Sequence, residues 1–175
     1  MPSNQFVTDR IKDIIPNENI LSVSFLSGPS FATEVMQKRP TGLVMASTDI
    51  EFANSFKKAV QSNFLKIQPF NDLIGAQFAS IYKNSIAIGA GILDALGYED
   101  NTRSMYMTNA LVEMITLGKE LGAKAETFLT YAGIGDLLLT CYSSKSRNYS
   151  FGHHIAKLSI GKDNLNEPGF NLTTE

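Results

Sequence analysis

Lys83 is the one basic residue in a stretch of apolar and small side chains that covers residues 72–96. The stretch predicts a helix. The residues on the same face of this helix as Lys83, which we call the Lys83 stripe, are short or acidic: Ala76, Ala79, Ala87, Ala90 and Asp94. Such a face leaves room above the ammonium for a small ligand. The alternative is a lysine that runs along the helix and reaches solvent. Larger side chains, which can pack into a core, form a neighbouring stripe: Ile74, Phe78, Ile81, Ile88 and Ile92.

Three glycines, Gly75, Gly89 and Gly91, lie near the Lys83 stripe. A glycine inside a helix costs about 1 kcal/mol relative to alanine. Several glycines in one helix therefore predict the close approach of another body. That body is either a second helix or a small ligand.

A turn after an expected strand is a second candidate site. Residues 21–26 alternate with period two, which predicts a strand, and this strand leads into Ser27-Gly28-Pro29-Ser30 and a helical stretch at 31–37. Loops at strand ends are where α/β sheets hold ligands, and Gly28 would let the backbone approach an anion. The alternative is a plain turn.

A third candidate site lies between residues 133 and 148. Asp136 opens the apolar run 137–141, where a helix cap or first-turn carboxylate belongs. Further on, residues 143–148 place hydroxyl, amide and guanidinium donors before a helical stretch at 149–158. The start of a helix attracts anions, and the fork of Arg147 suits a phosphate. The alternative is ordinary capping beside a solvated arginine.

The expected elements change character near residue 71. Strands at 21–26, 40–47 and 63–70 alternate with helices, which predicts βαβ units and a largely parallel sheet. From residue 72 onward only helical patterns occur. One of them, at 101–121, is expected to begin at an Asn101 cap and to bury this stripe: Met105, Leu111, Val112 and Ile115.

Composition excludes several functions for the 175-residue chain. Its formal net charge of -2 gives no overall positive charge to attract nucleic acid or an anionic membrane.

The single cysteine, Cys141, cannot form an intrachain disulfide and is expected to be a buried, inert thiol. His153 and His154 are adjacent, so on a helix they cannot share a metal. The sequence has neither a run long enough for a membrane span nor a signal-peptide pattern, and a cytoplasmic location is expected.

Taken together, the motifs resemble the NAD(P)-dependent glycerol-3-phosphate dehydrogenase family. Four of them occur in the order and spacing of that family: residues 27–34, Lys83-Asn84, Gly135-Asp136 and Ser146-Arg147-Asn148. The resemblance implies an α/β region followed by an all-α region, that is, part of a Rossmann-type parallel sheet and a helical domain like that of 6-phosphogluconate dehydrogenase. On this basis residues 1–71 are expected to be the C-terminal part of the NAD(P)-binding domain. Residues 72–175 are expected to form a truncated helical substrate domain.

The resemblance also implies a role for each matching residue. Lys83 is the expected general acid and base, and Arg147 is expected to reach both the substrate phosphate and the cofactor. Ala32 is expected to lie against the dinucleotide. The other expected substrate contacts are Gly28, Ser30, Asn84, Asp136, Thr140, Ser146 and Asn148. The expected partners are dihydroxyacetone phosphate or sn-glycerol 3-phosphate, NAD or NADP, and a second copy in a homodimer.

One departure from the family is clear: the sequence has no Gly-x-Gly-x-x-Gly after a strand to cradle a pyrophosphate. The chain is therefore interpreted as a fragment that is inactive alone. Two alternatives remain open at this point. The first is a binding or dimerisation module for a phosphorylated metabolite, and the second is a related dehydrogenase of the 3-hydroxyacid or 6-phosphogluconate type.

Overall fold

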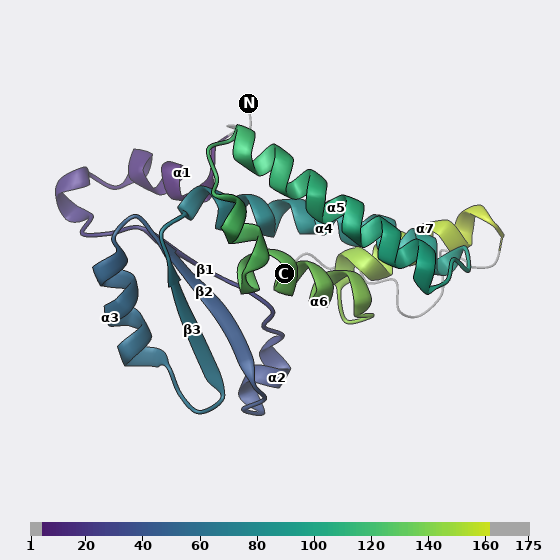
Figure 1. Cartoon of the computed structure of the whole chain (residues 1–175), viewed down its shortest axis with the longest axis horizontal. Helices are drawn as coiled ribbons and strands as arrows, with labels where there is room; N and C mark the ends of the chain where they lie inside the picture. The colour runs from purple at the N-terminus through teal and green to yellow at the C-terminus, as the bar shows by residue number, and fades with distance from the viewer. Residues whose placement is uncertain (1–4, 162–175) are drawn as a thin grey trace.

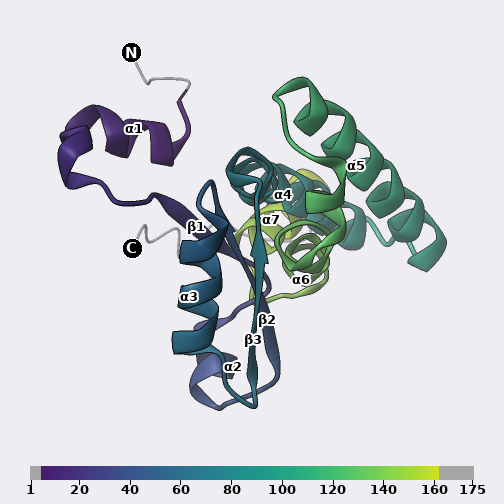
Figure 2. The same ribbon diagram turned by 60° about the vertical axis from the view of Figure 1, so that its left-hand side comes forward.

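The computed structural model describes residues 5–161 (Figures 1 and 2). One long helix, α4, packs against both a small sheet and the other helices. The elements in chain order are α1 (Val7–Ile14), η1 (Asn17–Asn19), β1 (Ser24–Ser27), α2 (Ala32–Met36), β2 (Thr41–Ser47), α3 (Ile50–Val60), β3 (Leu65–Phe70), α4 (Leu73–Ala95), α5 (Asp100–Glu120), η2 (Ala125–Leu129), η3 (Tyr131–Gly135), α6 (Asp136–Tyr142) and α7 (Arg147–Ser159). None of these helices is both long and apolar enough to cross a membrane.

The sheet has the order β1-β2-β3 and is mixed. β2 and β3 are parallel, as expected, and the 11-residue helix α3 makes the crossover between them. β1 runs antiparallel to β2, with Ser24 opposite Ser47, so the expectation of a parallel pair is wrong here. The link between β1 and β2 contains only the five-residue helix α2, which is too short for the usual helical crossover.

β2 lies in the middle of the sheet and is buried on both faces. Leu43 and Met45 pack towards α3. Val44 and Ala46 pack towards the start of α4 and η3. Figure 2 shows α3 on one side of the sheet and α4 with α6 on the other. Because successive side chains of a strand point to opposite faces, β2 packs against α3 on one face. On its other face it packs against the helical region that carries the expected site residues.

Asp72 anchors the start of α4. Its side chain caps the helix by accepting from the backbone N–H of Gly75 at 2.9 Å. It also accepts from the N–H of Lys124 at 2.8 Å and from the hydroxyl of Thr127. One buried carboxylate therefore ties the beginning of α4 to the segment that leads into α6.

The most buried face of α4 is the stripe of small residues, and from the expected apolar stripe Phe78 packs against the same core. Ala79, Ala87 and Ala90 are buried in the main helical core, whereas Ile81 is 58% exposed. Short side chains let neighbouring helices come close, and the glycines extend this effect. A Cβ on Gly91 would stand 2.0 Å from the carbonyl oxygen of Tyr149, in α7. Of the two bodies expected beside these glycines, it is a helix that approaches Gly91.

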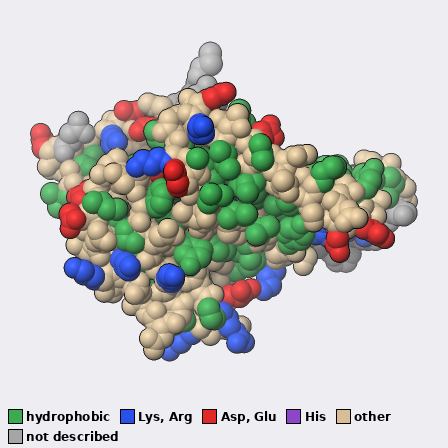
Figure 3. Space-filling model, viewed as in Figure 1, with side chains coloured by type: hydrophobic (Ala, Val, Ile, Leu, Met, Phe, Trp, Pro, Cys, Tyr) green, Lys and Arg blue, Asp and Glu red, His purple; other side chains and the backbone are tan. Residues whose placement is uncertain are grey.

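α5 differs from its expected start and, in part, from its expected stripe. It begins one residue earlier, after Glu99, so Asn101 is not its cap. Met105 and Val112 are 60% and 59% exposed. The other two residues of the expected stripe, Leu111 and Ile115, are partly buried against the helical core. The fully buried positions are Met107, Ala110, Met114 and Gly118. Figure 3 shows apolar side chains gathered in the middle of the face seen in Figure 1, which fits a helix with apolar residues on more than one side.

Candidate active site

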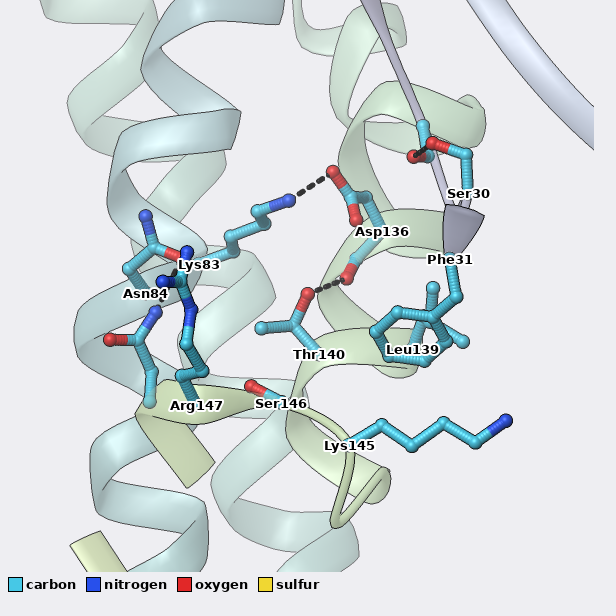
Figure 4. Close-up of a pocket in the computed structure, with 12 residues that line it drawn as sticks. Ser30, Phe31, Lys83, Asn84, Asp136, Leu139, Thr140, Lys145, Ser146 and Arg147 are labelled. Atoms are coloured by element: carbon cyan, nitrogen blue, oxygen red, sulfur yellow. Dashed lines mark hydrogen bonds and ion pairs between the residues drawn. The ribbon is translucent and has the colours of Figure 1, made fainter. Parts of the chain in front are cut away.

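The expected substrate residues line one open cavity of about 350 Å³ (Figure 4). It lies where the β1–α2 turn, α4, α6 and the start of α7 meet. All nine residues expected to touch substrate line it: Gly28, Ser30, Lys83, Asn84, Asp136, Thr140, Ser146, Arg147 and Asn148. Ala32, the expected cofactor contact, is exposed at the start of α2 and follows the cavity residue Phe31.

Lys83 and Asp136 form an ion pair inside the cavity. The ammonium of Lys83, from α4, contacts the carboxylate of Asp136, the first residue of α6. Their side chains are 20% and 6% exposed. Lys83 therefore does not reach the surface as a free cation, and Asp136 binds a side chain instead of capping a helix. Thr140 donates to the backbone carbonyl of Asp136 at 2.6 Å, one turn along α6.

Two asparagines connect α4 to α7 beside this ion pair. The Asn148 amide donates to the side-chain oxygen of Asn84 at 2.9 Å. Asn84 in turn donates to the carbonyl of Ser80 at 3.1 Å. Ser146 caps α7 by accepting from the N–H of Tyr149 at 3.3 Å. These bonds hold the first turn of α7 in place. Ser146 therefore caps this helix, as expected.

Gly28 has a structural reason to be glycine. Its φ of 144° is unfavourable for other residues, and a Cβ there would stand 2.8 Å from the carbonyl oxygen of Gly42. The close neighbour of Gly28 is therefore strand β2. Ser30 donates to the Gly28 carbonyl at 3.0 Å, and Ser27 shares a 2.7 Å hydrogen bond with Ser80 of α4. The turn is thus held against both the sheet and α4.

Arg147 is exposed, and within residues 5–161 its guanidinium makes no hydrogen bond or ion pair. It is the first residue of α7 and extends beside Asn84 in Figure 4. An arginine fork at the start of a helix can bind a phosphate through two parallel hydrogen bonds, with support from free backbone N–H groups. The cavity therefore combines a buried amine with an accessible guanidinium.

Three cavity residues were not singled out from the sequence: Phe31, Leu139 and Lys145. Each lies inside or next to a stretch that was. Phe31 follows Ser30 directly, and Lys145 lies within residues 143–148. The ammonium of Lys145 contacts Glu34 at 2.8 Å and lies 5.6 Å from the centre of the Phe31 ring. Their position could have been inferred from adjacency, but this contact between distant segments could not.

Cys141 lies in α6 and is buried. Burial raises the pKa of its thiol to about 12. Lys83 lowers this pKa and Asp136 raises it, and both effects are smaller than that of burial. A thiol with so high a pKa is neutral at physiological pH, which agrees with the expected inert residue. His153 lies 3.6 Å from Asp94, away from the cavity residues.

Comparison with known proteins gives consistent matches. The model of the NAD-dependent glycerol-3-phosphate dehydrogenase C-terminus matches residues 72–172, and that of the N-terminus matches residues 2–53. The chain is 41% identical over 170 residues to the glycerol-3-phosphate dehydrogenase [NAD(P)+] of Mesoplasma florum, covering 97% of this chain and 50% of the relative. For the same enzyme of Sulfurimonas denitrificans the identity is 44% over 155 residues, covering 89% and 51%.

A solved structure shows the same arrangement. The crystal structure of glycerol-3-phosphate dehydrogenase from Coxiella burnetii matches with a TM-score of 0.72 and 34% identity, over 81% of this chain and 46% of that one. The chain spans about half the length of the curated relatives it matches. The sheet followed by helices is thus the fold seen in these dehydrogenases. The chain belongs to the NAD-dependent glycerol-3-phosphate dehydrogenase family.

Proposed function

We propose that this chain provides the substrate site of an NAD(P)-dependent glycerol-3-phosphate dehydrogenase. The reaction is reversible hydride transfer between a nicotinamide and C2 of dihydroxyacetone phosphate, which gives sn-glycerol 3-phosphate. The observation that carries the proposal is the cavity itself, because Lys83 and Arg147 line it together although they are far apart in the sequence. The curated relatives support this reaction over the related 3-hydroxyacid and 6-phosphogluconate types.

Lys83 acts on the oxygen of C2. Negative charge grows on the carbonyl oxygen during reduction, and the ammonium of Lys83 donates a proton to it. In the reverse direction the neutral amine accepts the proton of the hydroxyl. Asp136 holds the Lys83 amine in place through their ion pair, and burial strengthens this interaction.

Arg147 binds the phosphate of the substrate. Its guanidinium has no partner among residues 5–161, so a phosphate does not compete with an existing ion pair. The first turn of α7 adds the backbone N–H groups of a helix start. The remaining proposed substrate contacts line the same cavity: Gly28, Ser30, Asn84, Thr140, Ser146 and Asn148.

NAD or NADP, where bound, would supply the hydride. Ala32 and Arg147 are the residues of this chain proposed to contact it. The sequence has no glycine-rich turn for the pyrophosphate, and β1 leads instead into a turn whose Gly28 packs on β2. The residues present therefore do not form a complete dinucleotide site. We expect the isolated chain to lack activity, because hydride transfer needs a positioned nicotinamide.

Two measurements test this proposal. Titration calorimetry of the chain with sn-glycerol 3-phosphate should give binding that Arg147→Ala weakens, whereas glycerol, which lacks the phosphate, should bind poorly to both. In an active dehydrogenase that contains this chain, Lys83→Met should lower kcat by about 10² to 10⁴ and change substrate affinity little. Unchanged affinity in Arg147→Ala, or normal turnover in Lys83→Met, would reject the corresponding role.

A second candidate function is binding without catalysis, and the absence of a glycine-rich turn favours it for the chain alone. Ligand binding without NAD(H) turnover in the isolated chain would support it. The family likeness also suggests a homodimer in the cytoplasm, divided at residue 71 into a sheet domain and a helical domain. Sedimentation of the purified chain tests the dimer, and limited proteolysis near residue 71 tests the division.

A further inference from the structure

A second ion pair lies at the edge of the cavity and has no role in the proposed reaction. The Lys145 ammonium pairs with Glu34 at 2.8 Å and lies 5.6 Å from the centre of the Phe31 ring. Glu34 and Phe31 belong to α2 and the turn before it, whereas Lys145 belongs to the α6–α7 loop. Phe31 and Lys145 both line the cavity. One lysine therefore joins two cavity-lining segments that are 111 positions apart.

The α6–α7 loop joins Lys145 to Arg147 and is held by its own hydrogen bonds. Within the loop, the N–H of Ser146 donates to the Ser143 carbonyl at 3.0 Å, and the N–H of Lys145 donates to the Ser143 hydroxyl at 3.2 Å. Ser150 of α7 donates to the Ser144 carbonyl at 2.9 Å. These bonds brace the loop that leads from Lys145 to Arg147, the first residue of α7.

The other side of the contact is equally fixed. Phe31 immediately precedes α2, and the turn before it is held by the Ser30 hydrogen bond and by the packing of Gly28 on β2. Figure 4 shows the Lys145 side chain directed away from Lys83. Lys145 is therefore oriented to hold the turn and not to reach the reacting atoms.

We propose that Glu34, Phe31 and Lys145 form a clasp that holds the β1–α2 turn to the α6–α7 loop and thereby positions Arg147 for phosphate. Lys145 is a positioning residue, and the inference rests on the proposed binding of a phosphorylated substrate. The side chains of Lys145 and Glu34 are 59% and 43% exposed, so water screens their attraction. We expect loss of the clasp to weaken binding of sn-glycerol 3-phosphate by about two- to fivefold, the effect of an exposed pair.

The sign of the effect of Glu34→Gln separates the clasp from simple electrostatics. Removal of a negative charge near the cavity should strengthen binding of an anion if only the long-range field matters. If the clasp positions Arg147, the same substitution should weaken binding. The matched control is Glu120→Gln, which removes one negative charge from the exposed end of α5 and should leave the affinity unchanged. Calorimetric titration of each variant of the chain with sn-glycerol 3-phosphate gives the dissociation constants.

The charge-swapped variant Glu34→Lys/Lys145→Glu completes the test, because it keeps the net charge and can rebuild the ion pair. It should bind more tightly than Glu34→Gln, which is the reverse of the order that the long-range field alone predicts. Unchanged or tighter binding in Glu34→Gln, together with weaker binding in Arg147→Ala, would overturn the clasp and leave the proposed function intact. Unchanged binding in Arg147→Ala would overturn the phosphate site and the clasp with it.

Discussion

The cavity has a floor and a rim that hold their charges in different ways. The floor consists of Lys83, Asp136 and Thr140, on the helices α4 and α6. Its ion pair is mostly buried, with side chains 20% and 6% exposed. The rim consists of Glu34, Lys145 and Arg147, at helix starts and in a loop. Its ion pair is 59% and 43% exposed, and Arg147 is exposed as well.

Because of this difference, we expect the floor to contribute mainly to folding stability and the rim mainly to ligand binding. A buried charge that loses its partner remains in a poorly solvated place, so the floor is expected to tolerate little change. An exposed charge is solvated by water whether or not it is paired, so rim residues can be exchanged at small cost to folding. The rim is consequently the part of the cavity where affinity can be tuned.

Asp136→Ala should have the largest effect, because it leaves the Lys83 ammonium without its partner in a mostly buried place. We expect a loss of about 3 to 5 kcal/mol in the free energy of unfolding, measured by urea denaturation. The control on the rim is Glu34→Ala, which should cost less than about 1 kcal/mol. Equal losses in the two variants would remove the distinction between floor and rim.

The titration of Cys141, next to Thr140 in α6, measures how well water is excluded near the floor of the cavity. Burial raises the pKa of its thiol to about 12, so the folded state keeps a proton that the unfolded chain releases near pH 9. The stability that this contributes is present below pH 9 and is lost as the pH rises towards 12. Unfolding free energies measured between pH 8 and pH 11 should therefore fall more steeply for the natural chain than for Cys141→Ala, and parallel curves would contradict a buried thiol.

The sequence indicated the cavity residues because each one lies at a local signal. Ser146 and Asp136 stand at helix starts, Gly28 lies in a turn after a strand, and Lys83 interrupts an apolar helix. None of these signals alone shows that the residues meet. Their joint order and spacing did so through the family resemblance, and the structure brings the nine expected substrate residues to one cavity.

Other features could not be read from the sequence for physical reasons. The alternation that identified β1 is the same in parallel and antiparallel strands, so it could not give the direction of pairing with β2. Periodicity also failed to choose the packed face of α4, because alanine is small enough to be either core or surface. The contact of Glu34 with Lys145 joins distant segments and leaves no local pattern.

Asn84 and Asn148 lie between floor and rim, and the effect of breaking their bond should be intermediate. Their 2.9 Å hydrogen bond is partly buried and joins α4 to the start of α7. A double-mutant cycle with Asn84→Ala and Asn148→Ala should give a coupling energy of about 1 kcal/mol in urea denaturation. A coupling near zero would mean that the Ser146 cap and the glycine-mediated helix packing hold the first turn of α7 without this bond.

Arg147→Lys should have the smallest effect on folding and a clear effect on binding. The guanidinium is exposed and has no partner among residues 5–161, so the free energy of unfolding should change by less than about 0.5 kcal/mol. Lysine keeps the charge and loses the planar fork, so binding of sn-glycerol 3-phosphate should weaken by about tenfold, the equivalent of one charge-assisted hydrogen bond. Calorimetry and denaturation of the same preparation measure both quantities. If binding follows charge alone, Arg147→Lys will match the natural chain while Arg147→Ala will not, and the rim then recognises phosphate as a point charge rather than through a bidentate fork.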